Sequence, residues 1–419
     1  MIRAGALVYA VFLSIILAIV SGFFILRAYY QNQYFDNAIL RESLVSDVNS
    51  AYNVLLENWS VIKDKDAAEI DLYSDDEHIV IVQKKAWGFY ENIICKSIRN
   101  NIEYSKKAMV GDNVFTGEGV ALYLCDYNNY LSLCGNTILK GICWLPKKGV
   151  KPAFIEGKSF SGSKYVEGTI KQSESTLPEI NKNLILYHKD YLEGKSKVQD
   201  SLIWYESVEK DTIINSFNNK TLCLYSDNVL TLEDKTIIGN IIVKSAKGIV
   251  IEPSTNIRDI VLYAPYLEVK EGFKGSFQSI NSDSILIKED CELMFPSVLA
   301  LIISDEIDVI KYINIDENSI VSGAVILYNE KLLQNNKSIL RIEKDAVVNG
   351  QVYCNSFTDH KGRIFGSLYT SKLLLETKSA IYESHLLDSE VNFKDLSTYY
   401  SGSSLFENYT KKEVIKWLH

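Results

Sequence analysis

VSGAVI (321–326), VNGQVY (348–353) and IFGSLY (364–369) are three copies of one six-residue motif. Each copy has an aliphatic residue first, glycine third, an aliphatic residue fifth and a large residue sixth. Looser copies, which keep glycine in third place, begin at residues 139, 155, 166 and 237. The glycines of these copies, here called the repeat glycines, are Gly141, Gly157, Gly168, Gly239, Gly323, Gly350 and Gly366.

The spacing of the motif copies limits the possible folds. The copies at 139 and 155, like those at 348 and 364, start 16 residues apart. This spacing leaves no room for the helix of a β-α-β unit. An antiparallel sandwich is one alternative, but its turns do not repeat one residue type. Glycine in a fixed frame favours a β-solenoid, in which each coil stacks on the previous one. We therefore expect an interrupted solenoid of the right-handed β-helix kind.

A fixed glycine has a physical meaning in such a coil. At a corner where the backbone bends or passes close to its neighbour, glycine avoids the clash that a Cβ atom would cause. The aliphatic residues two positions before and two positions after each glycine would then point inward and stack from coil to coil. The motif therefore predicts both the corners and the core.

The composition favours strands and excludes one class of partner. Of the 419 residues, 47% are apolar, six are proline and 26 are tyrosine, which argues against a disordered chain. The formal net charge is -9, and the basic residues are scattered among acidic ones, so no surface for nucleic acid is expected. We expect a mainly β fold that binds no nucleic acid.

The amino-terminal segment, 1–26, predicts a membrane anchor. Residues 4–26 contain no charged side chain, and as a helix they would be about 35 Å long, enough to cross a bilayer. A cleaved signal peptide is the alternative, but its apolar region is usually only about 7 to 15 residues long. We expect a retained single-pass transmembrane helix that contacts the lipid bilayer. Because most of the chain follows this helix, the bulk is expected in the periplasmic or extracellular space.

Helical periodicity continues beyond the apolar segment. No proline or glycine occurs from Arg27 to Trp59, and apolar residues recur at spacings of three and four. Residues 27–60 are therefore predicted to form an amphipathic helical stalk. The next segment, 61–116, mixes alternating strand-like pieces with one helical piece, Ala86 to Met109, and is predicted as a small membrane-proximal α+β region.

The remaining chain divides into four regions. Residues 117–180 are predicted to hold the first solenoid coils, and 181–235 a non-repeating insertion, because the motif is absent from most of that segment. Residues 236–395 are predicted as the main solenoid. Residues 396–419 are expected to cap the last coil with a short helix from Tyr409 onward, since an open coil exposes strand edges.

The later motif copies resemble those of bactofilins, bacterial polymer-forming β-helix proteins in which aliphatic-x-Gly-x-Val phrases recur coil after coil. The resemblance covers roughly 150 to 250 residues and implies stacked coils. Bactofilin cores are shorter and more regular, and this chain adds an anchor, a stalk and interruptions. The resemblance therefore concerns architecture and does not extend to end-to-end polymerisation.

The amino-terminal helix has a second distinctive pattern. A short charged leader, Met1 to Gly5, precedes an apolar helix that starts at Ala6-Leu7 and continues into an amphipathic half. This arrangement resembles the helix of type IV pilins and pseudopilins, although Ala10 stands where that family usually has Glu. The resemblance covers about 55 residues. It implies a minor component of a filament or secretion machine, with other assembly proteins or copies of itself as partners.

Cysteine and histidine form no recognisable site in the sequence. Of the seven cysteines, Cys125, Cys134 and Cys143 are spaced nine residues apart, without a C-x-x-C pair or a histidine at zinc spacing. We expect neither a metal nor a cofactor. In an oxidising compartment, one pair among these three can form a disulfide.

Acid, imidazole and base gather only in the segment from Thr358 to Arg363, which is expected to be a loop between coils. Asp359, His360 and Arg363 are the weak candidates there, with Asp359 or His360 as general acid or base in polysaccharide cleavage. Polysaccharide-cleaving β-helices carry charged side chains along one strand face over several coils, and this sequence shows no such row. We predict a solvated turn and no catalytic residue.

Two functions follow from these patterns. The leading hypothesis is a non-enzymatic, membrane-anchored cell-envelope protein whose solenoid is a structural scaffold or an assembly surface, as in a pilus-like or secretion machine. The alternative is a polysaccharide-binding or polysaccharide-cleaving β-helix protein. An aromatic groove on the outer face of the coils would favour the glycan hypothesis. A flat face of mixed charge would contradict it.

Overall fold

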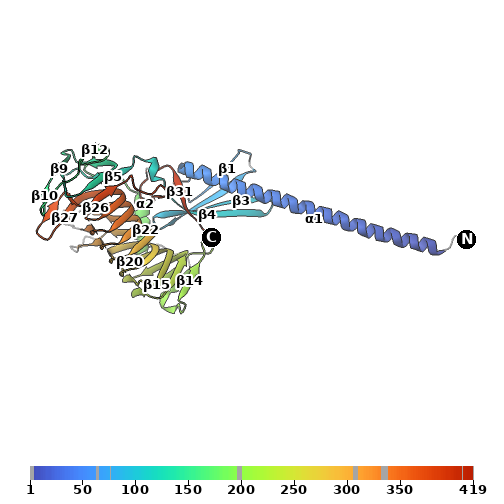
Figure 1. Ribbon diagram of the computed structural model, residues 1–419. Helices are drawn as coiled ribbons and strands as arrows, with labels where there is room; N and C mark the ends of the chain where they lie inside the picture. Colours follow the sequence, from blue (N-terminus) through green and yellow to red (C-terminus); the bar gives the residue numbers. More distant parts are fainter. Residues whose placement is uncertain are drawn as a thin grey trace. The chain divides into compact units, whose positions relative to one another are not determined.

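The chain folds into a mainly β protein with one long amino-terminal helix and a parallel solenoid, which confirms the predicted fold class in these features (Figure 1). The computed structural model describes residues 4–62, 66–75, 77–195, 201–304, 310–331, 338–407 and 409–418. The chain divides into two compact units. The smaller unit holds most of α1 and the adjoining parts of β1 to β4, and the larger unit holds the solenoid.

In the smaller unit, a helix packs on a sheet. Helix α1 (Ala4–Glu57) runs without a break for 54 residues, as the periodicity predicts. Its second half buries apolar residues three and four positions apart, among them Leu44, Val48 and Leu55. The sheet follows chain order with β1 (Ala67–Asp71), β2 (Ile79–Trp87), β3 (Tyr90–Arg99) and β4 (Ile102–Asp112), of which β2 to β4 continue into the larger unit.

The helix predicted for residues 86–109 is wrong. This segment belongs to β2, β3 and β4, which are joined by tight turns at Gly88 and at Asn100-Asn101. Both asparagines have positive φ angles, 48° and 62°, as in a two-residue hairpin turn. The apolar spacing of the flanking residues fits a helix as well as a strand, so the turn residues decide the structure.

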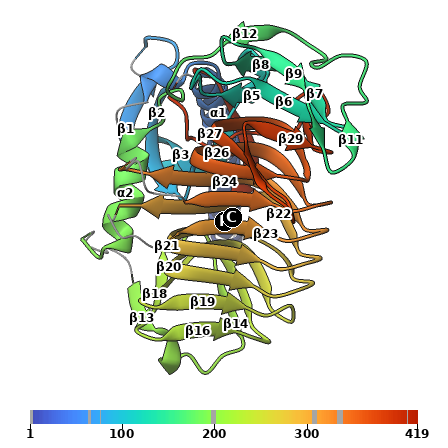
Figure 2. The ribbon, with the colours of Figure 1, turned by 90° about the vertical axis from the view of Figure 1, so that its left-hand side faces the viewer.

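The larger unit is a β-solenoid whose coils have three strand-bearing sides, here called faces A, B and C. Face A includes β18 (Ile241–Ser245), face B includes β19 (Gly248–Ile251), and face C includes β17 (Thr236–Gly239). Strands of neighbouring coils pair in parallel on every face, and Figure 2 shows the resulting stack. The handedness of the winding stays a prediction.

Long strands of the solenoid bend around corners and contribute to more than one face, as β20 does by pairing with β17, β18 and β19. The remaining elements of the solenoid are β5 (Val120–Leu124), β6 (Leu131–Cys134), β7 (Ile138–Lys140), β8 (Ile142–Leu145), β9 (Val150–Pro152), β12 (Ile170–Gln172), β13 (Ser201–Trp204), β14 (Thr212–Asn215), β15 (Leu222–Ser226), β16 (Val229–Leu232), β20 (Asn256–Val269), β21 (Lys274–Ile287), β22 (Glu292–Ile303), β23 (Tyr312–Ile315), β24 (Ile320–Asn329), β25 (Ile339–Ile342), β26 (Val347–His360), β27 (Arg363–Glu376), β28 (Ile381–Glu383), β29 (His385–Leu387) and β30 (Glu390–Asn392). Short 3-10 helices are η1 (Trp59–Val61), η2 (Val114–Thr116) and η3 (Tyr205–Ser207).

The inward aliphatic ladder predicted from the motif is confirmed. Val321 pairs with Val348, which pairs with Ile364 on the next coil. Two residues after each glycine, Val325 and Val352 align in the same way and continue into Leu368. All six side chains are fully buried in the core of the solenoid. Burial of such aliphatic side chains, repeated in every coil, is the main stabilising contribution to the stack.

Six of the seven repeat glycines lie at the corner between faces C and A: Gly141, Gly168, Gly239, Gly323, Gly350 and Gly366. Five of them lie against the backbone of a neighbouring coil, whereas the nearest atoms to Gly141 belong to the side chains of Ala121 and Phe393. Gly157 does not lie at this corner. It lies in the hairpin turn between β10 (Phe154–Ile155) and β11 (Lys158–Ser159), where open space surrounds it. Glu156 and Gly157 both have positive φ, so this glycine serves a two-residue turn.

The order of the coils differs from the expectation that residues 117–180 form the first coils. Strand β5 pairs with β27, β6 with β29, and β7 with β30. The segment from β5 to β12 therefore stacks on the last coil of the C-terminal part and lengthens the solenoid there. In Figure 2 the coils run from β13, β14 and β16 at one end to β5, β8 and β12 at the other.

The segment 181–235, predicted to be a non-repeating insertion, is mostly solenoid, because β13 to β16 form the coils at one end of the stack. Among the described residues of this segment, α2 (Lys182–Leu192) is the element that leaves the stack, and it packs against β20 and β21. The buried imidazole of His188 accepts a hydrogen bond from the Tyr263 hydroxyl (2.9 Å) and donates one to the Gly88 carbonyl (3.0 Å).

The predicted C-terminal cap helix is also wrong. Residues Lys412–Leu418 form strand β31, which extends the sheet beside β4. Backbone hydrogen bonds from Asn113 N–H to the Lys411 carbonyl (3.0 Å) and from Gly402 N–H to the Asp112 carbonyl (2.7 Å) hold this segment. A free strand edge of β4 thus selects the extended conformation for a sequence whose apolar spacing is compatible with a helix.

Candidate functional site

Aromatic side chains lie in register on the outer surface of face A. Tyr353 pairs with Tyr369 on the next coil, Tyr369 with Tyr123, and Tyr123 with Trp144. The ring centroid of Tyr123 lies 6.2 Å from that of Tyr369 and 5.9 Å from that of Trp144. The Nζ atom of Lys171, on the following coil, lies 5.0 Å from the centroid of the Trp144 ring. Parallel pairing places equivalent side chains about 4.8 Å apart, so these groups form a stacked column.

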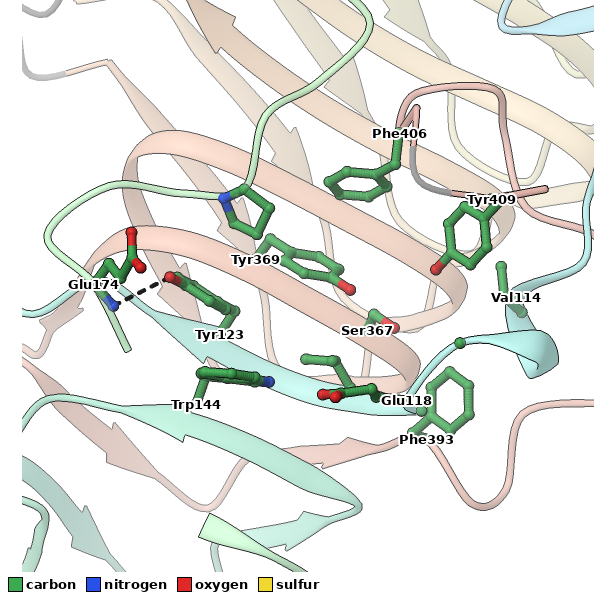
Figure 3. A pocket seen from close by; sticks show the side chains of 14 residues that line it. Val114, Glu118, Tyr123, Trp144, Glu174, Ser367, Tyr369, Phe393, Phe406 and Tyr409 are labelled. Atoms are coloured by element: carbon green, nitrogen blue, oxygen red, sulfur yellow. Dashed lines mark hydrogen bonds between the residues drawn. The ribbon is translucent and has the colours of Figure 1, made fainter. Parts of the chain in front are cut away.

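This column borders a pocket of about 350 Å³ beside β27, β5 and β8 (Figure 3). Much of the remaining outer surface of face A is covered by α2 and by the C-terminal segment, which form one apolar cluster with it. Six aromatic side chains line the pocket: Tyr123, Trp144, Tyr369, Phe393, Phe406 and Tyr409.

Hydroxyl groups supply much of the polarity of the pocket. Ser367 and Tyr369 follow Gly366 by one and three positions, so both side chains point outward from β27. Figure 3 shows their hydroxyl oxygens and that of Tyr409 directed into the same space. Burial raises the pKa of Tyr369 and raises that of Tyr409 to about 12, so both phenols stay protonated at neutral pH. All three groups can therefore donate and accept hydrogen bonds.

Two carboxylates lie at the pocket wall. Both oxygens of Glu118 lie 2.8 Å from Nζ of Lys171, so this carboxylate is ion-paired. The backbone N–H of Glu174 donates to the Tyr123 hydroxyl (3.2 Å), which in turn donates to the Thr176 carbonyl (3.2 Å). The Tyr123 hydroxyl therefore anchors the loop that carries the second carboxylate.

Glycine on both sides of Glu118 lets two aromatic rings approach the pocket wall closely. A Cβ atom on Gly117 would lie 3.2 Å from the Tyr409 ring, and one on Gly119 would lie 3.0 Å from the Phe393 ring. Gly119 also has a φ angle of 67°, which favours glycine. These two glycines let rings from the C-terminal segment close the pocket.

No family model, curated protein or solved structure matches this chain. The bactofilin and pilin resemblances therefore stay predictions.

Sequence reasoning missed the residues of this pocket, although the motif carried a signal. The sixth motif position is Tyr353, Tyr369 or Trp144 in three copies, and these residues form the outer column. Aromatic residues recurring at one outward position would have predicted an aromatic surface. Phe393 and Tyr409 come from irregular segments after the solenoid, and no spacing in the sequence links them to the motif.

The weak polar candidates do not form a site. Asp359 and His360 end strand β26, and Arg363 starts β27, so the expected loop is only two residues long. His360 is buried and donates from Nε2 to the Glu390 carbonyl (3.0 Å), whereas Asp359 lies on the opposite side of the strand with Lys361 Nζ 3.0 Å away. Burial lowers the pKa of His360 to about 4 and raises that of Asp359 to about 6.

His360 makes the fold sensitive to acid. The unfolded imidazole binds a proton near pH 6.5, but the folded one does so only near pH 4, so stability falls as the pH drops through this interval. We expect acidification from about pH 7.5 to pH 4.5 to lower the free energy of unfolding of the unsubstituted protein by about 2 kcal/mol more than that of His360→Leu. Chemical denaturation at both pH values measures the difference, and Asp359 titrates in both proteins.

A matched control for this prediction is His385→Leu, which removes a half-buried histidine from β29. If His385→Leu changes the pH dependence of stability as much as His360→Leu does, the effect is not specific to the buried imidazole of His360. If His360→Leu and the unsubstituted protein lose equal stability on acidification, the buried imidazole is not responsible.

The cysteines form neither disulfides nor a metal site in this structure. All seven are buried with free thiols, so the disulfide considered among Cys125, Cys134 and Cys143 is not formed. Burial raises the pKa of Cys143 to about 12, which keeps this thiol protonated. Within the described parts of the chain, no cluster of three or more His, Cys, Asp or Glu residues is arranged to hold a metal ion.

Proposed function

We propose that this chain is a non-enzymatic, membrane-anchored scaffold protein that carries its solenoid in the periplasmic or extracellular space. The division of α1 into two parts supports this proposal. Every large apolar side chain from Leu7 to Ile39 is at least 42% exposed, whereas Leu44, Val48 and Leu55 are fully buried within the smaller unit. One continuous helix therefore has an uncovered apolar part and a part that belongs to a folded unit.

The uncovered part has the chemistry of a membrane-spanning helix. Transferring apolar surface out of water is favourable by about 25 cal/mol per Å², so an exposed apolar segment of this length is unfavourable in water. A bilayer can cover residues 5–26, which contain no charge. Arg27, Tyr29 and Tyr30 follow at once, and such residues are enriched at the interface between membrane and water.

The proposal of a non-enzymatic protein is supported by the ion pairing and the burial of the candidate acid and base groups. Glu118 is ion-paired with Lys171, and His360 faces the core as a neutral imidazole. A general acid or base needs access to substrate and a pKa suited to proton transfer. A solenoid with a stacked aliphatic core is instead a rigid support for surfaces and loops.

The membrane anchor can be tested with charged substitutions. We expect the full-length protein to fractionate with membranes and to resist extraction at alkaline pH. The double variant Ile15→Arg/Ile19→Arg should lose membrane integration, because each arginine near the middle of a span costs about 2.5 to 3.5 kcal/mol. Ile39→Arg is the control, because this equally exposed isoleucine lies outside the span. Recovery of the double variant in the integral membrane fraction would contradict the anchor.

A filament or secretion-machine component is the more specific form of this proposal. It is favoured by the exposed side chains of Phe35 and Ile39, which continue the apolar surface of α1 beyond the span. The leader residues 1–3 lie outside the described residues. Determining the mature amino terminus distinguishes the possibilities: processing after Gly5 supports the pilin-like form, retention of Met1 supports a plain anchor, and cleavage after the helix contradicts both.

A further inference from the structure

We propose that the aromatic pocket of the solenoid binds an uncharged sugar ring, as part of a glycan. The pocket lies within the larger unit, and its two kinds of lining group match the two kinds of surface on a sugar. A pyranose ring has faces of C–H groups and a rim of hydroxyl groups. Aromatic rings pack against the C–H faces, and hydroxyl or carboxylate oxygens form hydrogen bonds with the hydroxyl rim.

Six aromatic side chains line the volume of about 350 Å³. The ring faces of Tyr123 and Trp144 are covered by their neighbours in the column, so Phe393, Phe406 and Tyr409 supply the apolar part of the match. This volume is in the lower part of the range of small-molecule pockets, about 300 to 1,000 Å³, and suits a ligand of one or two rings. Phe393 and Tyr409 lie across the pocket from the Tyr123 and Trp144 rings, and Phe406 packs on Tyr369, as Figure 3 shows.

The polar part comes from Ser367, Tyr369 and Tyr409, whose hydroxyl groups face the same space (Figure 3). Sugar hydroxyls need partners that both donate and accept, and these three groups do both. Glu118 adds acceptor oxygens at the edge, where its carboxylate is held by Lys171. A carboxylate fixed in this way can orient the hydroxyl groups of a sugar, and it adds no positive charge to the pocket.

The charge of the lining favours a neutral ligand. Glu118 and Glu174 are its ionisable carboxylates, and its described members include no lysine, arginine or histidine. The nearby base, Lys171, is already paired with Glu118. A uronic acid, a sialic acid or a phosphosugar would therefore meet negative charge without an available cation.

A quaternary ammonium ion is the rival ligand, because aromatic rings next to carboxylates also bind cations. The stacking in the column argues against it. One face of the Trp144 ring lies against Tyr123, and Nζ of Lys171 lies 5.0 Å from the same ring. The strongest cation–π partner in the pocket is thus already occupied by a cation of the chain itself.

The site is largely formed before a ligand arrives. Tyr123 is tied through its hydroxyl to the loop at Glu174 and Thr176, and the Tyr369 ring packs 4.8 Å from that of Phe406. Backbone hydrogen bonds fix the segment before β31, which carries Tyr409. Little ordering is needed on binding, which is the condition for a small ligand to bind measurably.

The test is a binding experiment on the full-length protein in detergent micelles. The probes are glucose, galactose and N-acetylglucosamine with their β-linked di- and tetrasaccharides, and calorimetry or saturation-transfer NMR is the readout. We expect at least one neutral probe to bind. Ser367→Ala and Tyr409→Phe should each weaken its binding by about threefold to tenfold, the effect of losing one neutral hydrogen bond. Glucuronic acid should bind more weakly than glucose.

Matched controls separate the pocket from the rest of the surface. Tyr266→Phe and Ser276→Ala make the same chemical changes on lower coils, outside the pocket, and should leave binding unchanged. Unchanged thermal unfolding of each variant verifies folding. The proposal is overturned if no sugar binds, or if the Ser367 and Tyr409 substitutions leave the affinity for the sugar unchanged. It is also overturned if tetramethylammonium binds and the sugars do not. None of these outcomes affects the membrane-anchor proposal.

Discussion

Gly350→Ala is expected to lower the free energy of unfolding of the solenoid by about 3 kcal/mol or more, because it combines strain with a backbone clash. Gly350 has a φ angle of 146°, which side chains rarely adopt. A Cβ atom there would lie 1.9 Å from the carbonyl oxygen of Gly323 on the neighbouring coil. The clash cannot be relieved locally, because Gly323 and Gly366 pair with Gly350 from both sides.

The control for this prediction is Gly157→Ala. Gly157 also has a positive φ angle, 77°, but open space surrounds the position of its missing Cβ atom. The control therefore reports the conformational strain alone, about 1 to 2 kcal/mol. Urea denaturation followed by circular dichroism compares the two variants. Equal destabilisation would mean that the close approach of the coils does not explain the glycine at this corner.

Lys412→Met is expected to cost about 3 to 5 kcal/mol, because it leaves buried carboxylates without their counter-charge. Nζ of Lys412 lies 2.6 Å from Asp112 and 2.9 Å from Glu91, and the side chain is only 5% exposed. The same amine donates to the Ser404 hydroxyl and lies 5.0 Å from the centroid of the Trp59 ring. Methionine keeps much of the side-chain volume, so the loss reports the charge.

Its neighbour provides the control. Lys411 pairs with Glu57 on the surface, where the two side chains are 43% and 70% exposed, and such pairs contribute about 0 to 1 kcal/mol. Lys411→Met should therefore unfold almost like the unsubstituted protein. Burial alone would lower the pKa of Lys412, but Asp112 and Glu91 outweigh it and raise this pKa. As far as the titration of the amine itself is concerned, the contribution of Lys412 is therefore fully present below about pH 10 and is lost as the pH rises beyond its raised pKa.

The motif predicted the corner and the core of a coil because both depend on a few neighbouring residues. Glycine is needed at the corner because the backbone of the next coil lies close to it. The residues on either side are aliphatic because they are buried in the core. Both conditions recur at Gly323, Gly350 and Gly366, and the structure meets them there. Gly157 shows the limit of the pattern, because a hairpin turn requires a glycine for a different reason.

The pocket was less predictable than the core. Trp144 and Tyr369 share a motif position, so an outward aromatic column was implicit in the repeat. Phe393 and Tyr409 reach the same pocket from segments without any repeat, so only the tertiary structure brings them to it. The weak candidate His360 failed because strand β26 continues to it and turns its ring toward the core.

By itself, the sequence determined a long apolar-to-amphipathic helix, a strand-rich body and the glycine corner of its coils. These features depend on contacts between residues close in sequence, or on a pattern that recurs in several copies of the motif. Tertiary structure alone decided that β5 stacks on β27, that β31 is a strand beside β4, and that an aromatic pocket opens on face A. The physical reason is that every coil presents the same backbone donors and acceptors at its edge, so hydrogen bonding does not select the neighbour. Side-chain packing across the assembled stack makes that selection.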